Sequence, residues 1–450
     1  MFEFLPEFGG LIWTLLAFVV ALSIIVFIHE LGHYLVGRWS GIKADVFSLG
    51  FGPVLFSRHD RHGTKWQFAA LPFGGYVKFA GDADAASATR DVDALEALTP
   101  EDRRHTMAGA PLWARAATVA AGPVFNFVLS ILLFGALILS QGTQKYPLEV
   151  GALEPLPYAH ELQEGDVLRA VAGFPVPEQG DSVAAEALRA GLVPSETQPY
   201  DITRDGTEMT VPGPYPFLPL IQRVAPQSAA FSAGLQPGDV ILSVNGETIY
   251  AFSSLREIVE SSEGAALDLR VWRADAEGEE VLDLTLAPRR VDEPQPEGGF
   301  RTAYRIGIIG GWFFTPATEA TGLLDAVQGG VTQTWMIMES SLSGLYHIVT
   351  GAISSCNLSG PIGIAQTSGA MASQGTTSFL WFIALLSAAV GFLNLMPVPV
   401  LDGGHLVFFA WEAVTGRPPS DRALKILMSI GLVCVLSLMV FALGNDIFCP

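Results

Sequence analysis

Charged residues are scarce in this sequence, and basic residues are the scarcest. Charged side chains make up 16% of the 450 residues, with 25 Lys and Arg against 45 Asp and Glu and a formal net charge of −20. Between Gln141 and Gly330 there are 28 acidic and 12 basic residues. This balance argues against a nucleic-acid partner, and it predicts a solvated acidic region in the middle of the chain.

Cysteine is also rare. The three cysteines, Cys356, Cys434 and Cys449, show none of the close spacings that are typical of Cys-ligated metal sites. Cys356 and Cys449 fall on the same side of the membrane in the topology given below. A disulfide between them and two free thiols are both compatible with the sequence, because spacing alone does not decide pairing.

Long apolar runs, by contrast, are abundant. Four of them contain no charged residue and are long enough to span a bilayer: Leu11–Ile28, Ala116–Ser140, Thr376–Leu401 and Ile426–Gly444. The first run is not preceded by basic residues and has no small-residue cleavage site, so we interpret it as a retained helix and not as a signal peptide. The third run contains Pro397 and Pro399, which predict a break near its end.

The distribution of Lys and Arg predicts the orientation of these runs. Ten basic residues lie between Arg38 and Arg115, and the connection after the third run carries Arg417, Arg422 and Lys425. Basic loops stay in the cytoplasm. We therefore expect these two connections to be cytoplasmic, and the middle region and both termini to lie on the other side.

The end of the first apolar run carries the motif His29-Glu30-Leu31-Gly32-His33. On a helix, His29 and His33 lie one turn apart on the same face, so both imidazoles can bind one metal ion. Glu30 is not needed as a ligand and can accept a proton from a water molecule that the metal activates. Chance matches to H-E-x-x-H occur in soluble proteins, but His and Glu are rare inside transmembrane helices, which favours a metal site.

A third ligand is expected from the far end of the chain. Asp402 closes the third apolar run, beside the two prolines and before Gly403 and Gly404. A carboxylate there is costly unless it is paired or bound to a metal, so Asp402 can complete a His-His-Asp zinc site with water in the fourth position. The alternatives for Asp402 are a helix cap or a salt bridge to an arginine.

Asn126 is a polar residue in the second apolar run. Its side chain either makes a hydrogen bond that helps the helices to pack or contacts the active site, and we favour the packing role.

The connections contain β-like segments. Short segments between Gly41 and Gly81, with glycine-rich turns at Gly50-Phe51-Gly52-Pro53 and Gly74-Gly75, predict hairpins that either dip into the bilayer edge or form a small cytoplasmic domain. In the middle region, Leu162–Gly173 repeats as Leu235–Gly246 at an offset of 73 residues. The second copy closely resembles the PDZ domains of bacterial proteases. The first departs from the pattern, because Ala172 replaces the Asn of an Asn-Gly turn.

Together these motifs resemble the site-2 protease family of intramembrane zinc metalloproteases, in the bacterial branch of the regulator of sigma-E proteases, which has four spanning segments and two PDZ domains. The motifs that carry the resemblance are listed here: His29–His33, Gly50–Pro53, Gly74–Lys78, Ala121-Gly122-Pro123, Ser359–Ile362 and Asn394–Asp402. The resemblance implies Zn²⁺ as the cofactor. It also implies cleavage of single-pass membrane proteins, such as anti-sigma factors or remnant signal peptides, after a first cut by another protease.

The same resemblance implies roles for further residues and a location. Asn394 would hold the substrate backbone in extended form, and Gly74, Gly75 and Tyr76 would pair with it as a strand. The PDZ domains would either bind peptide ends or exclude bulky ectodomains. The protein would lie in the bacterial inner membrane, in contact with lipid, with its active site toward the cytoplasm and its PDZ domains in the periplasm.

We therefore expect a polytopic α-helical membrane protein with a membrane-associated β-hairpin region and two α+β PDZ-like domains. The expected segments follow the chain: helix with H-E-x-x-H, 1–40; hairpin loop, 41–82; cytoplasmic linker, 83–110; second helix, 111–141; PDZ-like domains, 145–215 and 216–291; linker with an amphipathic surface helix, 292–375; third segment, 376–412; fourth helix, 423–445. Two other functions were weighed. A membrane scaffold with an inactive metal site has no use for Glu30, and a zinc transporter would be expected to carry further membrane carboxylates or histidines.

Overall fold

The computed structural model describes residues 8–82, 98–178, 181–275, 278–295 and 299–448. Most of the expected linker at 83–110, and Cys449, lie outside these residues. Cys356 is disulfide-bonded, and Cys434 is free and exposed. The chain divides into two compact units, which are described separately. The first comprises residues 1–137, 323–349 and 358–449, and the second comprises residues 138–322, 350–357 and 450.

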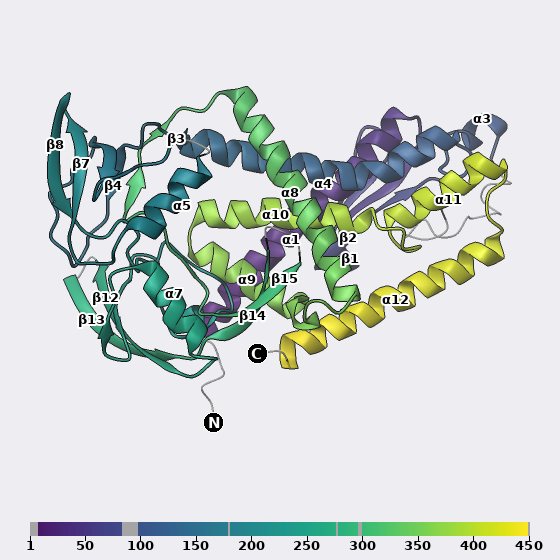
Figure 1. Cartoon of the computed structure of the whole chain (residues 1–450). Coiled ribbons are helices and arrows are strands. Elements are labelled where there is room, and N and C mark those ends of the chain that lie inside the picture. Colours follow the sequence, from purple (N-terminus) through teal and green to yellow (C-terminus); the bar gives the residue numbers. More distant parts are fainter. Residues whose placement is uncertain (1–7, 83–97, 179–180, 276–277, 296–298, 449–450) are drawn as a thin grey trace. The chain divides into compact units, whose positions relative to one another are not determined.

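The first unit consists of long helices and one curled β-ribbon (Figure 1). Its elements are α1 (Phe8–Trp39), β1 (Ala44–His59), β2 (Lys65–Phe79), α3 (Pro100–Arg103), α4 (Leu112–Gln141), α8 (Leu323–Val349), α9 (Pro361–Ser373), α10 (Thr376–Asn394), α11 (Asp402–Thr415) and α12 (Asp421–Phe448). Four of these helices, α1, α4, α10 and α12, are long and apolar enough to cross a membrane. They coincide with the four predicted runs. A helix suits such a run because it satisfies every internal backbone hydrogen bond without water.

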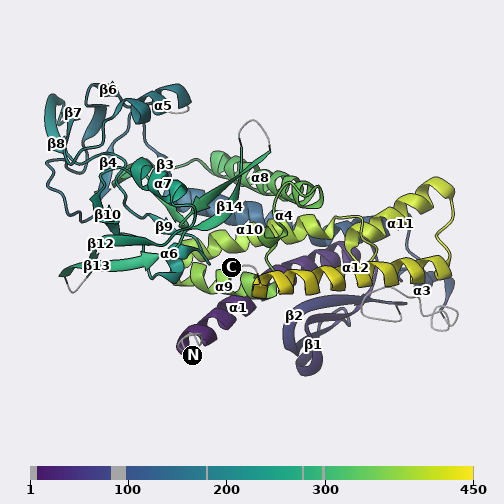
Figure 2. The same cartoon turned by 60° about the horizontal axis from the view of Figure 1, so that its bottom comes forward.

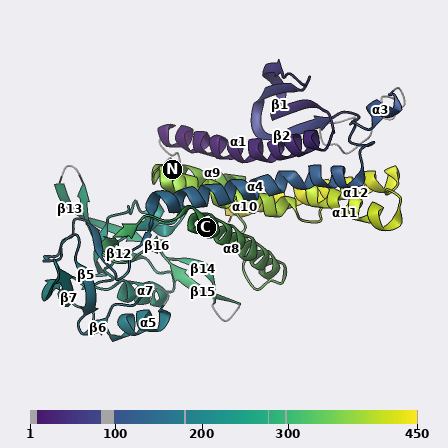
Figure 3. The same ribbon diagram turned by 90° about the horizontal axis from the view of Figure 1, so that it is seen from above.

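The β-ribbon lies along α1, and Figure 3 shows α1 between the ribbon and the other helices. The ribbon curls so that Ser48 pairs with both Gln67 and Tyr76. The two halves of each strand therefore form a narrow sheet, with residues 75–79 along one edge. The predicted hairpin is confirmed. Leu55 and Phe56 at its far end are 74% and 62% exposed.

Helix α9 was not predicted, because the sequence analysis assigned residues 292–375 to a linker with a single amphipathic surface helix. Pro361 occupies the first turn, where its missing N–H costs nothing. Asp446 of α12 accepts hydrogen bonds from the backbone N–H groups of Gly360, Ile362 and Gly363, at 2.7, 2.9 and 3.1 Å. Figure 2 shows this end of α12 beside α9. A pattern of small residues on one face of α9 gave too weak a signal to predict it.

The third apolar run is divided, as its prolines predict. Helix α10 ends at Asn394, and α11 begins at Asp402 after a short loop. Gly403 is required there, because a Cβ at this position would lie 2.2 Å from the carbonyl oxygen of Leu395. A partly buried ion pair joins α11 to α4: the Arg115 guanidinium donates two hydrogen bonds to the Glu412 carboxylate, at 2.6 and 3.1 Å. The loop and the ion pair together fix where α11 starts.

The second unit contains two four-stranded sheets of the same topology. The first has the strand order β6-β5-β7-β8 and the second β11-β10-β12-β13. Their elements are β5 (Val167–Val171), β6 (Phe174–Pro175), α5 (Ser182–Gly191), β7 (Gln198–Arg204) and β8 (Thr207–Gly213) in the first, and β10 (Val240–Val244), β11 (Glu247–Thr248), α7 (Phe252–Ser261), β12 (Leu267–Asp275) and β13 (Gly278–Leu286) in the second. Equivalent ion pairs anchor both sheets, with Arg204 on Asp166 and Arg273 on Asp239, each at 2.7 Å. The structure thus supports the repeat found in the sequence.

The stretch after residue 291, which we expected to be a linker, contains strands that pair with earlier strands of this unit. The remaining elements of this unit are β3 (Thr143–Gln144), β4 (Val150–Leu153), β9 (Arg223–Val224), α6 (Ala229–Ser232), β14 (Arg289–Pro294), β15 (Phe300–Arg305), β16 (Ile308–Ile309), β17 (Phe314–Pro316), β18 (Thr318–Glu319) and η1 (Ser355–Asn357). Strand β16 pairs with β9, and β17 pairs with β4. Phe313 and Phe314 are fully buried in the core of the first repeat. The expected boundary at 292 is therefore wrong, because proline-rich composition does not reveal pairing with distant strands.

Candidate metal centre

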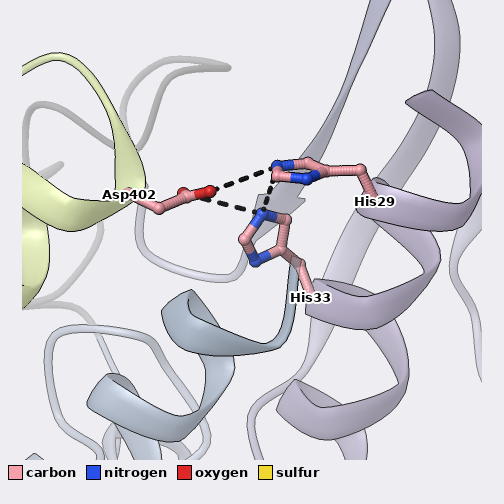
Figure 4. Close-up of side chains that lie close together, drawn as sticks. All are labelled: His29, His33 and Asp402. Atoms are coloured by element: carbon pink, nitrogen blue, oxygen red, sulfur yellow. Dashed lines mark hydrogen bonds and ion pairs between the residues drawn. The ribbon is translucent and has the colours of Figure 1, made fainter. Parts of the chain in front are cut away.

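Three side chains converge inside the first unit. His29 and His33 lie one turn apart on α1, and Asp402 is the first residue of α11. The Nε2 atoms of the two imidazoles are 3.2 Å apart. The Asp402 carboxylate oxygens lie 3.2 Å from the Nε2 atom of His29 and 3.6 Å from that of His33. Figure 4 shows the three side chains pointing toward one another, the two histidines from α1 and the aspartate from α11. The structure thus brings together the three ligands predicted from the sequence.

The arrangement of these atoms suits a metal ion. The donor atoms all lie within 4.8 Å of one another. The Oδ2 atom of Asp402 is buried and faces the Nε2 atom of His29, and a buried carboxylate oxygen is costly unless a cation or a donor meets it. Two imidazole nitrogens and one carboxylate oxygen are a donor set found in catalytic zinc sites. The residues present therefore fit a zinc ion.

Helix α4 leaves room for the imidazoles. Gly122 faces them, and a Cβ there would lie 2.3 Å from the Nε2 atom of His33 and 2.8 Å from the Cε1 atom of His29. Gly32 of α1 is equally close to α4, since its Cβ would lie 2.5 Å from the carbonyl oxygen of Ala121. The two helices therefore approach closely because both carry glycine at the contact.

Helix α4 also supports the ring atoms that do not face Asp402. The Nδ1 atom of His33 lies 2.9 Å from the backbone carbonyl oxygen of Thr118, to which it donates. The Nδ1 atom of His29 lies 3.2 Å from the side-chain amide of Asn126. Such outer contacts fix the orientation and tautomer of metal-binding histidines. The contact of Asn126 to the site is the alternative that the sequence analysis favoured less.

Glu30 lies beside the edge of the β-ribbon. A Cβ at Gly75 would be 3.1 Å from the Cγ atom of Glu30 and 2.9 Å from Val26. The backbone N–H of Val77 donates a hydrogen bond to the Glu30 carboxylate. The strand edge that contains residues 75–79 therefore runs directly past the predicted base.

The residues predicted to bind substrate lie in two places. Gly74, Gly75 and Tyr76 belong to β2, and Gly74 has a φ of +133°, a conformation that favours glycine. Tyr76 accepts a hydrogen bond from Gln67 and stacks on Phe51. Asn394 is the half-buried last residue of α10, just before the loop that leads to Asp402.

The sequence analysis missed two contributions to the site. Thr118 contributes its backbone carbonyl, which every residue type has, so the sequence gives no signal of this contact. Gly122 acts through the absence of a side chain. The only available signal was the run of small residues Ala121-Gly122, which the sequence analysis used only as a motif of the family resemblance.

Four apolar helices, together with a cluster of two histidines and an aspartate, indicate a membrane protein with a candidate metal centre. The comparisons with known proteins specify the class. Residues 17–438 match the family model described as peptidase family M50. The chain therefore belongs to peptidase family M50, which confirms the predicted family and the prediction that it is a peptidase.

Individual relatives match over nearly their whole length. A protein of Rhizobium meliloti, named as a candidate zinc metalloprotease, is 40% identical over 97% of this chain and 96% of its own. A similarly named protein of Agrobacterium fabrum is 36% identical over 98% and 97%. The regulator of sigma-E protease RseP of Salmonella typhimurium is 32% identical over 97% of this chain and 99% of its own.

Proposed function

We propose that this chain is a zinc endopeptidase that cleaves the transmembrane segments of single-pass membrane proteins. The observation that carries the proposal is the convergence of His29, His33 and Asp402 beside Glu30, in a unit that contains four helices apolar enough to span a bilayer. A structural metal site would need no adjacent free carboxylate. The names of the relatives, which include zinc metalloproteases, support zinc as the metal.

The chemistry follows from the positions of these residues. His29, His33 and Asp402 would hold the zinc ion, which when bound supplies a Lewis acid that polarises a carbonyl group and lowers the pKa of a water molecule. Glu30 accepts a proton from the attacking water and passes it to the leaving amine. The hydrogen bond from the Val77 N–H holds the Glu30 carboxylate in place for this transfer.

We further propose that the substrate binds as an added strand. A peptide bond inside a helix is shielded by its own hydrogen bonds, so a transmembrane helix must unwind before it can be cut. The edge of β2 at Gly74, Gly75 and Tyr76 offers backbone groups to an extended segment, and it lies against Glu30. Asn394, with its side-chain amide near the start of the loop to Asp402, would hold the same segment from the other side.

The substrate class is inferred from the family branch. The relatives in Salmonella are named regulators of sigma-E protease. We propose that this chain acts in the same kind of process, regulated intramembrane proteolysis, on an anti-sigma factor or a remnant signal peptide that another protease has already trimmed. The two repeats of the second unit, which we interpret as PDZ domains, either bind the trimmed end or exclude untrimmed ectodomains.

The proposed location is the bacterial inner membrane. The basic connections at 38–115 and 417–425 support an active site toward the cytoplasm. The acidic second unit then lies in the periplasm. This assignment is tested by labelling single cysteines introduced at exposed Arg61 and Glu208 in intact cells with an impermeant thiol reagent. Only the second should react.

The function is tested with the purified full-length protein and its Glu30→Gln variant in detergent. Bound zinc is measured, together with cleavage of a tagged single-pass helix that carries a short periplasmic tail. We expect both proteins to bind zinc and only the parent to cut within the helix. A parent that binds zinc but cuts no helix from a broad panel would support a scaffold instead.

A further inference from the structure

Asn126 occupies an unusual position beside the metal centre. Its side chain is completely buried, at 0% exposure, in the middle of the apolar helix α4. The side-chain nitrogen lies 3.2 Å from the Nδ1 atom of His29. The Oδ1 atom is buried and has no hydrogen-bond partner in the described part of the chain. A buried amide with one end on a metal-ligand histidine is too costly to be incidental.

The drawn orientation of the amide conflicts with a ligand role for His29. If the Asn126 NH₂ group donates to Nδ1, the neutral imidazole carries its proton on Nε2 and points an N–H group at the other ligands. Amide oxygen and nitrogen are nearly indistinguishable in most structures and are assigned from the surrounding hydrogen bonds. Turning the amide end for end still leaves one atom paired with His29 and one unpaired. The number of hydrogen bonds is therefore the same in the two orientations of the amide. Only the orientation in which Oδ1 faces His29 leaves the Nε2 atom without a proton and able to bind a metal ion.

We propose that Asn126 is a positioning residue for His29. Its Oδ1 atom accepts the Nδ1–H of His29, which keeps the Nε2 lone pair free and directed toward His33 and Asp402. This inference rests on the proposed metal site. It assigns to a side chain of α4 the control of the tautomer and ring orientation of one ligand.

The two histidines are then held in different ways. His33 donates to the backbone carbonyl of Thr118, a contact that side-chain substitution cannot remove. His29 depends on the side chain of Asn126. The backbone at Asn126 is itself fixed, because its carbonyl accepts a hydrogen bond of 2.9 Å from Ser387 of α10, which is fully buried. The amide is therefore presented to His29 from a rigid helix–helix contact.

The test compares three full-length variants in detergent. Asn126→Leu keeps the shape and removes the acceptor. Asn126→Asp keeps an acceptor oxygen. Ser130→Ala is the matched control on the same helix, because it also removes a buried polar group of α4, but one whose hydroxyl pairs with Thr334 of α8 at 3.0 Å. Zinc affinity is measured by competition with a chromophoric chelator, and thermal unfolding of the zinc-free proteins reports on folding.

We expect Asn126→Leu to weaken zinc binding about 10- to 100-fold, the range typical of lost outer-shell contacts. Asn126→Asp should stay within a few-fold of the parent even if it lowers the unfolding temperature, and Ser130→Ala should match the zinc affinity of the parent. Equal zinc affinity in the parent and Asn126→Leu would overturn the inference and leave the metal site standing. Equal losses in the Leu and Asp variants would show a packing role instead. Absence of zinc from the parent would overturn the proposed site and this inference together.

Discussion

Asp60, in the turn between β1 and β2, joins the ribbon to α1. Its carboxylate accepts hydrogen bonds from the Tyr34 hydroxyl at 2.7 Å and the Trp66 indole at 3.1 Å. The backbone N–H groups of His62 and Thr64 donate to its other oxygen, at 2.8 and 3.0 Å. Burial raises the pKa of Asp60, but these four hydrogen bonds outweigh burial and lower the pKa to about 2.

This lowered pKa predicts how stability depends on pH. A carboxyl with a depressed folded-state pKa stabilises the fold fully above its unfolded pKa of about 3.9, and the effect is lost as the pH falls through about 2. We expect Asp60→Asn to cost roughly 1 kcal/mol at pH 7, after allowance for partial solvent exposure. Unfolding in detergent, followed from pH 7 to pH 2, should show the gap between parent and variant closing below pH 4. A gap that stays constant down to pH 2 would contradict this account.

The two repeats of the second unit use different residues at the same strained turn. Ala172 and Asn245 have φ values of +49° and +51°, in the left-handed region that disfavours alanine. The Asn245 side chain accepts a hydrogen bond of 2.9 Å from the backbone N–H of Asp268. In the first repeat, Pro199 occupies the position that corresponds to Asp268, and the proline backbone has no N–H to donate. Asn at 172 would therefore lack its partner, which explains why the first copy departs from the pattern.

This difference predicts unequal effects of reciprocal substitutions. Asn245→Ala loses a hydrogen bond and keeps the strained backbone, so we expect a loss of roughly 1–2 kcal/mol. Ala172→Asn eases the strain without a new bond and should gain only about 0.5 kcal/mol. Hydrogen exchange of β10 and β5 in the full-length protein, measured by mass spectrometry, reports each effect locally. Equal and opposite changes would show that the hydrogen bond contributes nothing.

Among the helices, the contact between α1 and α4 determines the geometry of the metal centre. Both histidines lie on α1, and the groups that orient them, the Thr118 carbonyl and the Asn126 amide, lie on α4. Gly32 sits at the crossing, one residue before His33. Any side chain at position 32 must push the helices apart, and the orienting contacts would lengthen with them.

We therefore expect Gly32→Ala to weaken zinc binding at least ten-fold, although every ligand is intact, since outer-shell contacts contribute on this scale. The control is Gly10→Ala in the same helix, where an added Cβ meets no atom within 4 Å. It should leave zinc affinity unchanged and so exclude an effect of helix propensity. Normal zinc binding in Gly32→Ala would show that the spacing of α1 and α4 is not critical.

Among the helices and strands, those with a strong local sequence signal could be predicted, and those that depend on contacts with distant parts of the chain could not. The four spanning helices follow from uncharged length, and the ribbon follows from its glycine turns. Helix α9 was missed because its stability comes from packing on α1 and from the cap that Asp446 provides. Strands β16 and β17 were missed because they pair with β9 and β4, far earlier in the chain.

For the molecule as a whole, the candidate site was easier to predict than the scaffold around it. His29, His33 and Asp402 stand out because polar side chains in apolar runs are costly without a task. The Thr118 carbonyl and the missing side chain of Gly122 give no comparable signal in the sequence. The role of Asn126, in packing or in the site, was ambiguous until its distance to His29 was known. Sequence thus indicates which residues do the chemistry, and the three-dimensional structure indicates which residues hold them.

The central claim is that His29, His33 and Asp402 bind one zinc ion, and X-ray absorption at the zinc edge of the purified protein tests it most directly. We predict a first shell of nitrogen and oxygen only, at about 2.0–2.2 Å, with two imidazoles. Glu30→Gln should leave the spectrum unchanged, and His33→Ala should remove one imidazole or the zinc itself. Sulfur in the first shell, a single imidazole in the parent, or an unchanged His33→Ala spectrum would contradict the account.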